Sequence, residues 1–175
     1  MPRSLQRCFL GFFILATLAQ AAENWWRPQP PSRARTTGTG AWIRPARGEG
    51  LDLDATRMQT ALRDVVEQGA DLRIQLPVGD GEFAPFALEA VGVMAPALAE
   101  KYPEILTVHG VAIDRPGTWA RLDWTPQGFH GSVISERGAY YIDPYSPKDL
   151  RHYISYWKTE YEKNNVPVFQ ELPPI

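Results

Sequence analysis

Four short apolar stretches with turn signals between them occupy residues 104 to 145, and they constrain the fold more than any other feature. The stretches read EILTVHGVAI, GTWARLDW, GFHGSVISE and AYYIDPY, after an earlier pair, DLRIQLP and EFAPFALEAVGV, joined through Asp80-Gly81. Turns of two to four residues place each strand beside the previous one in antiparallel order. The sequence therefore predicts an antiparallel meander that twists strongly.

Two helices are expected beside this sheet. Residues 51–69 carry apolar side chains at helical spacing, with Asp52 or Asp54 available as the N-cap and Gly69 available to end the helix. A shorter helix is expected between Pro96 and Pro103. Residues 150–165 fit either a helical face or a strand. The predicted class is α+β: a twisted antiparallel meander with one amphipathic helix packed on a face and a short second helix.

The amino-terminal residues have the layout of a secretory signal peptide. A basic head precedes a short apolar run and an Ala-x-Ala site, so cleavage is expected after Ala21, with Ala22 as the alternative. We expect residues 1–21 to be the signal peptide, 22–50 a Pro/Gly/Arg-rich extended arm, 51–162 a single domain and 163–175 an extended tail. The arm's tryptophans are expected to dock on the domain, or else to bind a partner.

Removal of the signal peptide leaves 154 of the 175 residues and takes away Cys8, the one cysteine, together with Arg3 and Arg7, so that the formal charge falls from −2 to −4. A mildly acidic chain without a basic stripe argues against nucleic acid as a partner. No second apolar stretch reaches membrane length. We therefore expect a secreted or periplasmic protein without a membrane span after cleavage.

Catalytic motifs are not apparent. The histidines, His109, His130 and His152, do not form His-Glu-x-x-His, and neither Ser132 nor Ser135 lies in a nucleophile elbow. Asp123 and Asp143 fall on neighbouring predicted strands and could do acid–base work as a pair, but structural roles beside arginines and turn groups explain them better. We expect no catalytic residue, no metal ligand and no cofactor, and thus a protein that is not an enzyme.

The hairpin GFHGSVISERGAYYIDPYS, residues 128–146, leaves two registers open. A two-residue loop would place His130 opposite Asp143, whereas a bulged three-residue loop of Glu136, Arg137 and Gly138 would pair Gly131 with Asp143 and turn His130 to the other face. Because glycine suits the left-handed position of the bulged loop, we expect the bulged register and no His130–Asp143 pair.

Residues 71 to 157 carry a series of short motifs in a fixed order: Leu76-Pro77, Asp80-Gly81, a helix from Met94 to Pro103, Gly110 to Pro116, Thr125 to His130, Tyr141 to Tyr145, and Tyr153 to Tyr156. In this order and spacing the region resembles the amino-terminal, prodomain-like region of bacterial secreted reprolysin-like (adamalysin-like) zinc metalloproteases. The extended zinc-binding helix of the family's catalytic domain is not found in the sequence, and no ligand or catalytic residue of that domain can be carried over.

The resemblance implies a non-catalytic module that assists the folding of a separately encoded secreted metalloprotease or inhibits it, or that is a remnant of a truncated one. The alternative is a free-standing envelope or extracellular module that binds a peptide or glycan through exposed aromatic rings. Either function would use a surface of the predicted sheet. The candidate partner-binding residues are Trp119, Trp124, Phe129, His130, Tyr140, Tyr141, Asp143 and Tyr145.

Overall fold

The computed structural model describes residues 21–29, 43–92 and 96–164, and it confirms the expected α+β class. Nine antiparallel strands form one nearly closed sheet in the order β1-β2-β9-β8-β7-β6-β5-β4-β3. The expected signal peptide and most of the expected tail lie outside the described residues. The strands are β1 (Trp26–Pro28), β2 (Glu49–Leu53), β3 (Leu72–Gly79), β4 (Glu82–Ala90), β5 (Leu106–Ala112), β6 (Trp119–Thr125), β7 (Gly128–Ser135), β8 (Gly138–Pro144) and β9 (His152–Trp157).

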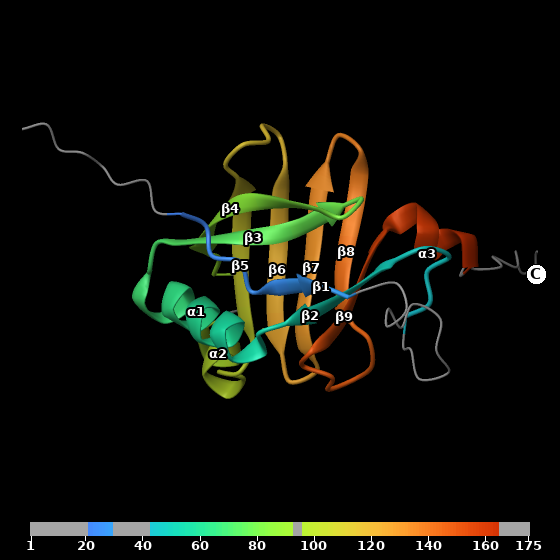
Figure 1. The fold of residues 1–175 in the computed structure, drawn as a ribbon. Coiled ribbons are helices and arrows are strands. Elements are labelled where there is room, and N and C mark those ends of the chain that lie inside the picture. The colour runs from blue at the N-terminus through green and yellow to red at the C-terminus, as the bar shows by residue number, and fades with distance from the viewer. Residues whose placement is uncertain (1–20, 30–42, 93–95, 165–175) are drawn as a thin grey trace, which may run out of the picture.

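The sheet folds over itself into two layers. In Figure 1, β1 to β4 pass across strands β5 to β8. Buried side chains from both sets of strands belong to one core cluster. Trp26 of β1, for example, lies 5.5 Å from Phe129 of β7, measured between ring centroids. The core between the layers is continuous, and its fully buried members include Phe86, Leu122 and Ile142.

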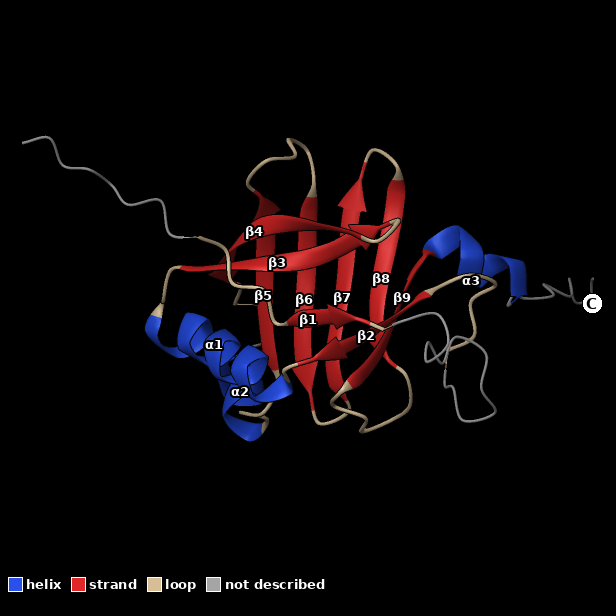
Figure 2. Cartoon of the chain, viewed as in Figure 1, coloured by secondary structure: helices blue, strands red, loops and turns tan. Residues whose placement is uncertain are grey.

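The helices of the described residues lie at the ends of the sheet, as Figure 2 shows. The helix α1 (Ala55–Gln68) is capped by Asp54, whose carboxylate accepts from the backbone N–H of Arg57, and it ends at Gly69 with φ +65°. It buries Met58, Leu62 and Val65 and packs mainly on β4 and β5. The short helix α2 (Pro96–Lys101) is confirmed, while α3 (Lys158–Asn164) follows directly on β9. The ambiguous stretch at 150–165 is thus a strand followed by a helix.

Residues at both ends of the expected arm belong to the sheet. β1 pairs with β2, and Glu23 forms a parallel bridge with Ile74 of β3. The segment from Glu23 to Pro28 therefore lies between β2 and β3. The boundary expected at residue 50 falls inside β2, and the one expected at 162 falls inside α3. Residues 22–29 lack the alternating apolar pattern of a strand, and within this segment Trp26 is buried in the core, with 3% exposure.

The outer strands offer little free edge. The N–H of Gln75 and the C=O of Arg73 point away from β4 and bond to Glu23. The backbone groups of every second residue of β3 point to this side, so those of Pro77 should do so as well. Proline has no N–H to donate there. At Gly79 an added Cβ would lie 2.6 Å from the Trp157 ring, so that ring covers the end of β3. While Glu23 is in place, pairing of β3 with a further strand is therefore disfavoured.

Replacing Trp26 should test whether the closing segment holds the sheet together. Because Trp26 is buried and packs edge-on against Phe129 and Tyr153, we expect Trp26→Ala to lower the free energy of unfolding by about 3–5 kcal/mol. The neighbouring exposed change Arg27→Ala should stay within about 0.5 kcal/mol. Urea unfolding followed by circular dichroism measures both; a loss below about 1 kcal/mol for Trp26→Ala would contradict this role.

Candidate binding surface

The eight candidate residues separate onto different sides of the sheet. Trp124, Phe129 and Tyr140 point into the core between the layers, with exposures of 3% or less, and Tyr145 is also buried. Trp119, His130, Tyr141 and Asp143 alternate with these core residues along β6, β7 and β8 and therefore lie on the outer face. The predicted set is not one surface, because residues on adjacent positions of a strand point in opposite directions.

The expected register of the β7–β8 hairpin is wrong. Ser135 pairs with Gly138 and Gly131 with Ile142, with no shift along the ladder, so the loop has two residues, Glu136 and Arg137. Gly138 does adopt a left-handed conformation, φ +117°, as its residue type suggested. It does so as the first residue of β8, without adding an unpaired residue. A positive φ at glycine is therefore compatible with the shorter loop.

In this register His130 and Asp143 do form a pair, which corrects the expectation that they would not. His130 Nδ1 lies 2.8 Å from Asp143 Oδ1, and the hydroxyl group of Tyr156 donates to Asp143 Oδ2 at 2.7 Å. Burial, followed by the charge of Asp143, raises the pKa of Tyr156, which keeps its hydroxyl protonated as a donor. The carboxylate thus holds an imidazole and a phenol in fixed orientations.

Cross-strand rows organise the outer face. One row is apolar: Val111 of β5 pairs with Trp119 of β6, which pairs with Ile134 of β7. The next row contains His109, Arg121, Ser132 and Tyr141, and the third contains Thr107, Asp123, His130 and Asp143. Thr107 donates to Asp123 at 2.7 Å, and Arg121 lies 3.5 Å from the same carboxylate. An apolar row therefore borders two rows of ordered polar groups.

The apolar row remains exposed, whereas the outer face at β9 is covered. Val111 is 49% exposed, Trp119 41%, and Ile113, just beyond the end of β5, 51%. On β9, by contrast, Ile154 and Tyr156 are buried. Gly48 packs closely on Ile154, and Tyr161 of α3 lies 6.1 Å from the Tyr156 ring between centroids. We call Val111, Ile113, Trp119 and Ile134 the outer strip.

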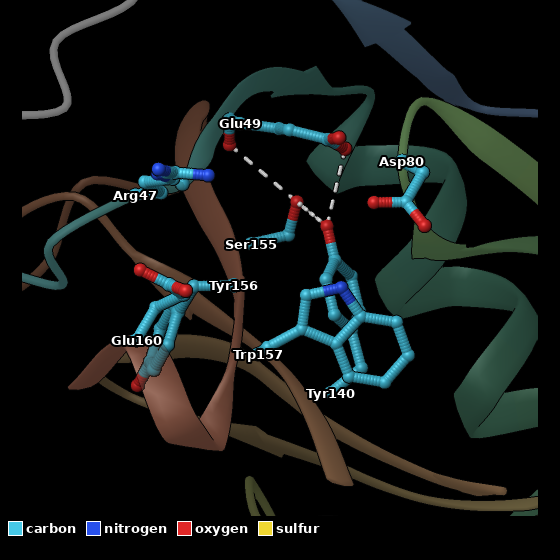
Figure 3. Close-up of a pocket in the computed structure, with 9 residues that line it drawn as sticks. Arg47, Glu49, Asp80, Tyr140, Ser155, Tyr156, Trp157 and Glu160 are labelled. Carbon is cyan, nitrogen blue, oxygen red and sulfur yellow. Dashed lines mark hydrogen bonds between the residues drawn. The ribbon is translucent and has the colours of Figure 1, made fainter. Parts of the chain in front are cut away.

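A separate hollow of about 300 Å³ lies where β2, β8, β9 and the β3–β4 turn meet (Figure 3). Glu49 stands at its rim: Oε1 accepts from the N–H of Gly81 at 2.7 Å, and Oε2 lies 3.1 Å from the hydroxyl group of Tyr140. That hydroxyl is also 3.0 Å from Oγ of Ser155. Burial raises the pKa of Tyr140, so the phenol stays neutral beside Glu49.

Polar groups around this hollow tie the two hairpin tips together. Asp80 of the β3–β4 turn forms an ion pair with Arg137 of the β7–β8 turn, which lowers the pKa of Asp80 through the hydrogen bond between them. The guanidinium of Arg137 also lies 4.7 Å from the centre of the Trp157 ring. No sequence motif indicated that Glu49, Asp80 and Arg137 would approach each other, because their separations along the chain are long. The described contacts of these three residues join β2 and the two turns to each other.

The described residues give little sign of metal or membrane chemistry. Among them, no group of three or more His, Cys, Asp and Glu side chains is arranged to hold a metal ion. None of the helices in these ranges is both long and apolar enough to cross a membrane.

His130 and Asp143 are ordered and partly exposed, so what the outer face offers is a fixed set of hydrogen-bonding groups beside an exposed tryptophan.

Comparison with family models, with curated proteins and with solved structures gives no match for this chain in any of the three. The resemblance to metalloprotease prodomains thus remains a prediction from the short motifs. The fold itself is defined by the strand order and register described above.

A cross-linking experiment can test the corrected register. In a Cys8→Ser background, we expect His130→Cys with Asp143→Cys to form a disulfide on mild oxidation, because directly opposed residues have Cα atoms about 4.5–5.5 Å apart, within the range that a disulfide spans. The control pair His130→Cys with Tyr141→Cys shares the face but is diagonal, and should remain reduced. Mass spectrometry of the oxidised chains reads the result; a cross-link in the control pair alone would favour a different register.

The buried phenols also predict how stability depends on pH. Burial raises the pKa of Tyr140, Tyr153 and Tyr156 in the folded chain, while the unfolded value is about 10. Their contribution is fully present below pH 10 and is lost above it, as the unfolded state releases protons that the folded state retains. We expect Tyr156→Phe to reduce the fall in unfolding free energy by about 1.4 kcal/mol per pH unit above pH 10.

Urea unfolding at several pH values above 10 measures this slope. Ser132→Ala is the control, because it changes the same face without removing an ionisable group, and its slope should equal that of the natural chain. An unchanged slope for Tyr156→Phe would contradict the retained proton on Tyr156.

Proposed function

We propose that this chain is a non-catalytic, secreted or periplasmic binding module that docks on another protein through the outer strip. The observation that carries this proposal is an exposed apolar row on the outer face of β5 to β7, next to ordered polar groups, whereas the outer face at β9 is covered. Trp119 lies in the middle of that row, between Val111 and Ile134. Exposed tryptophans surrounded by a polar rim are typical centres of protein interfaces.

Two structural features favour docking through this face over pairing at a sheet edge. The outer side of β3 is occupied by Glu23, Pro77 and Trp157, and β1 has only three residues. The outer strip, in contrast, presents large apolar side chains next to groups that are already ordered, such as Asp123 and His130. Ordered side chains lose little conformational entropy when a partner binds.

The sequence resemblance supplies the proposed partner, a separately encoded secreted zinc metalloprotease. The module would assist folding of that enzyme or hold it inactive by covering part of its surface. A remnant of a truncated protease would carry the same fold without a partner to bind. The resemblance is an analogy at family level, and binding must therefore be tested directly.

The alternative, an aromatic platform for a glycan, is less well supported. It requires a row of exposed rings, drawn from Trp119, Trp124, Tyr140, Tyr141, Tyr145, Tyr153, Tyr156 and Trp157. Among these eight, Trp119 is exposed, Tyr141 and Trp157 are partly buried, and the other five are buried. The buried rings belong to the scaffold. A single exposed ring suits an interface centre better than an extended stacking surface.

Binding to a secreted zinc metalloprotease from the same source tests the proposal. We expect the chain to bind the purified enzyme and to change its folding yield on co-expression or its proteolytic activity. Trp119→Ala should weaken binding at least tenfold, as expected for the centre of an interface. Isothermal titration measures the affinity, and thermal unfolding verifies that the variant is folded.

Leu98→Ala is the matched control, since Leu98 is 46% exposed but lies on α2, outside the outer strip. It should bind as the natural chain does. Equal affinity for the Trp119 variant would contradict docking through the outer strip, and no effect on enzyme yield or activity would contradict the partner. Trp119-dependent binding of a glycan, without binding of the enzyme, would favour the alternative.

A further inference from the structure

The segment of residues 22–29 occupies a groove between β2 and β3 in the way that a bound peptide occupies a sheet. The N–H and C=O of Glu23 both bond to β3, at Arg73 and Gln75. On the other side, β1 pairs with β2 from Trp26 to Pro28, and the N–H of Gln29 donates to Gly50. Backbone hydrogen bonds thus hold the segment from both sides, and such bonds do not depend on side-chain identity.

A single side chain provides most of the segment's burial. Trp26 is 3% exposed and meets Phe129 and Tyr153 edge-on, each at 5.5 Å between centroids. Trp25 is partly buried against the same core, whereas Glu23, Asn24, Arg27 and Pro28 are exposed. Gln29 also donates from its side-chain amide to Asp52, so the fully buried side chain of this segment is Trp26, with Trp25 and Gln29 in partial contact.

The fit of Trp26 depends on ring shape more than on polar recognition. Its indole N–H is buried, and no hydrogen-bond partner for it is found within the described part of the chain. A pocket that recognised tryptophan in particular would provide an acceptor for this group. Other aromatic side chains of similar size should therefore enter the same pocket.

A long stretch of chain also separates β1 from β2, its neighbour in the sheet. Residues 29–48 connect β1 to β2, although adjacent antiparallel strands need only a two-residue turn. Loss of β1 from the groove would leave the pairing of β2 with β9 in place, because that pairing lies on the other side of β2.

We propose that residues 22–29 are a replaceable strand, and that the groove between β2 and β3 is a binding site for an extended peptide segment with one aromatic anchor. The partner is a protein that presents such a segment and pairs with β2 and β3 through its backbone. Because the resident strand is tethered, with an effective concentration in the millimolar range, a partner must also be held by another contact. This site is distinct from the outer strip.

The test removes the tether from the full chain. A site for a specific protease is inserted between Gln29 and Ile43, and the folded chain is cut there. A fluorescent peptide with the sequence of residues 22–29 is then added at graded concentrations, and its incorporation is followed by fluorescence anisotropy and gel filtration. We expect saturable incorporation with release of the resident segment, and no incorporation into the uncut chain at the same concentrations.

Peptide variants test the anchor. Trp26→Ala in the peptide should weaken incorporation at least tenfold, whereas Trp26→Phe should be retained and Arg27→Ala should match the natural peptide. A peptide with serine in place of Glu23 and Arg27 should also bind, as expected if partner segments of different sequence are accepted. Equal incorporation of the Trp26→Ala peptide would overturn the aromatic anchor.

Two outcomes would overturn the replaceable strand itself. One is a cut chain that stays folded and takes up no peptide at millimolar concentration. The other is a cut chain that unfolds even with the peptide in excess. The same experiment with Trp119→Ala in the chain should give unchanged incorporation, so failure here is distinguishable from failure of docking at the outer strip.

Discussion

Three aromatic side chains, Trp26, Phe129 and Tyr153, meet where the two layers of the sheet cross, and the closed arrangement depends on their contact. They come from β1, β7 and β9. Besides the ring contacts, the hydroxyl group of Tyr153 accepts a hydrogen bond from the backbone N–H of Phe129 at 3.1 Å. Each ring contacts the other two, and these contacts join the outer strands to the meander within one buried core.

Closure determines which surfaces remain for function. The sheet has little free edge, since Glu23, Pro77 and Trp157 occupy the outer side of β3, and α3 with residues 43–48 covers the outer face near β9. The exposed face of β5 to β7 remains, with the outer strip next to ordered polar groups. The groove filled by residues 22–29 is a second, self-occupied surface. Both proposals use the same sheet in different ways, one through its outer face and one through a strand that completes it.

Most of the sheet was predictable because its strands are close in sequence. Turn residues such as Asp80-Gly81 and short apolar runs specify antiparallel neighbours locally, and Asp54 and Gly69 mark the ends of α1. The candidate surface was predicted less well. Its eight residues were chosen by type, but alternation along each strand sent Trp124, Phe129 and Tyr140 into the core, and the hairpin register brought His130 to Asp143 against expectation. Gly138 indicated a positive φ, but a two-residue loop and a bulged three-residue loop can both accommodate such a glycine. Its residue type therefore did not determine the register.

The sequence by itself determined the meander, the two expected helices and the absence of recognisable catalytic motifs, since these depend on residues that are neighbours along the chain. The tertiary structure decided three other features: the place of β1, the Asp80–Arg137 pair and the exposure of Trp119. Each depends on contacts between segments that are far apart in sequence. The physical reason is that burial of Trp26 and the crossing of the two layers are properties of the closed sheet, and no local pattern in residues 22–50 encodes them.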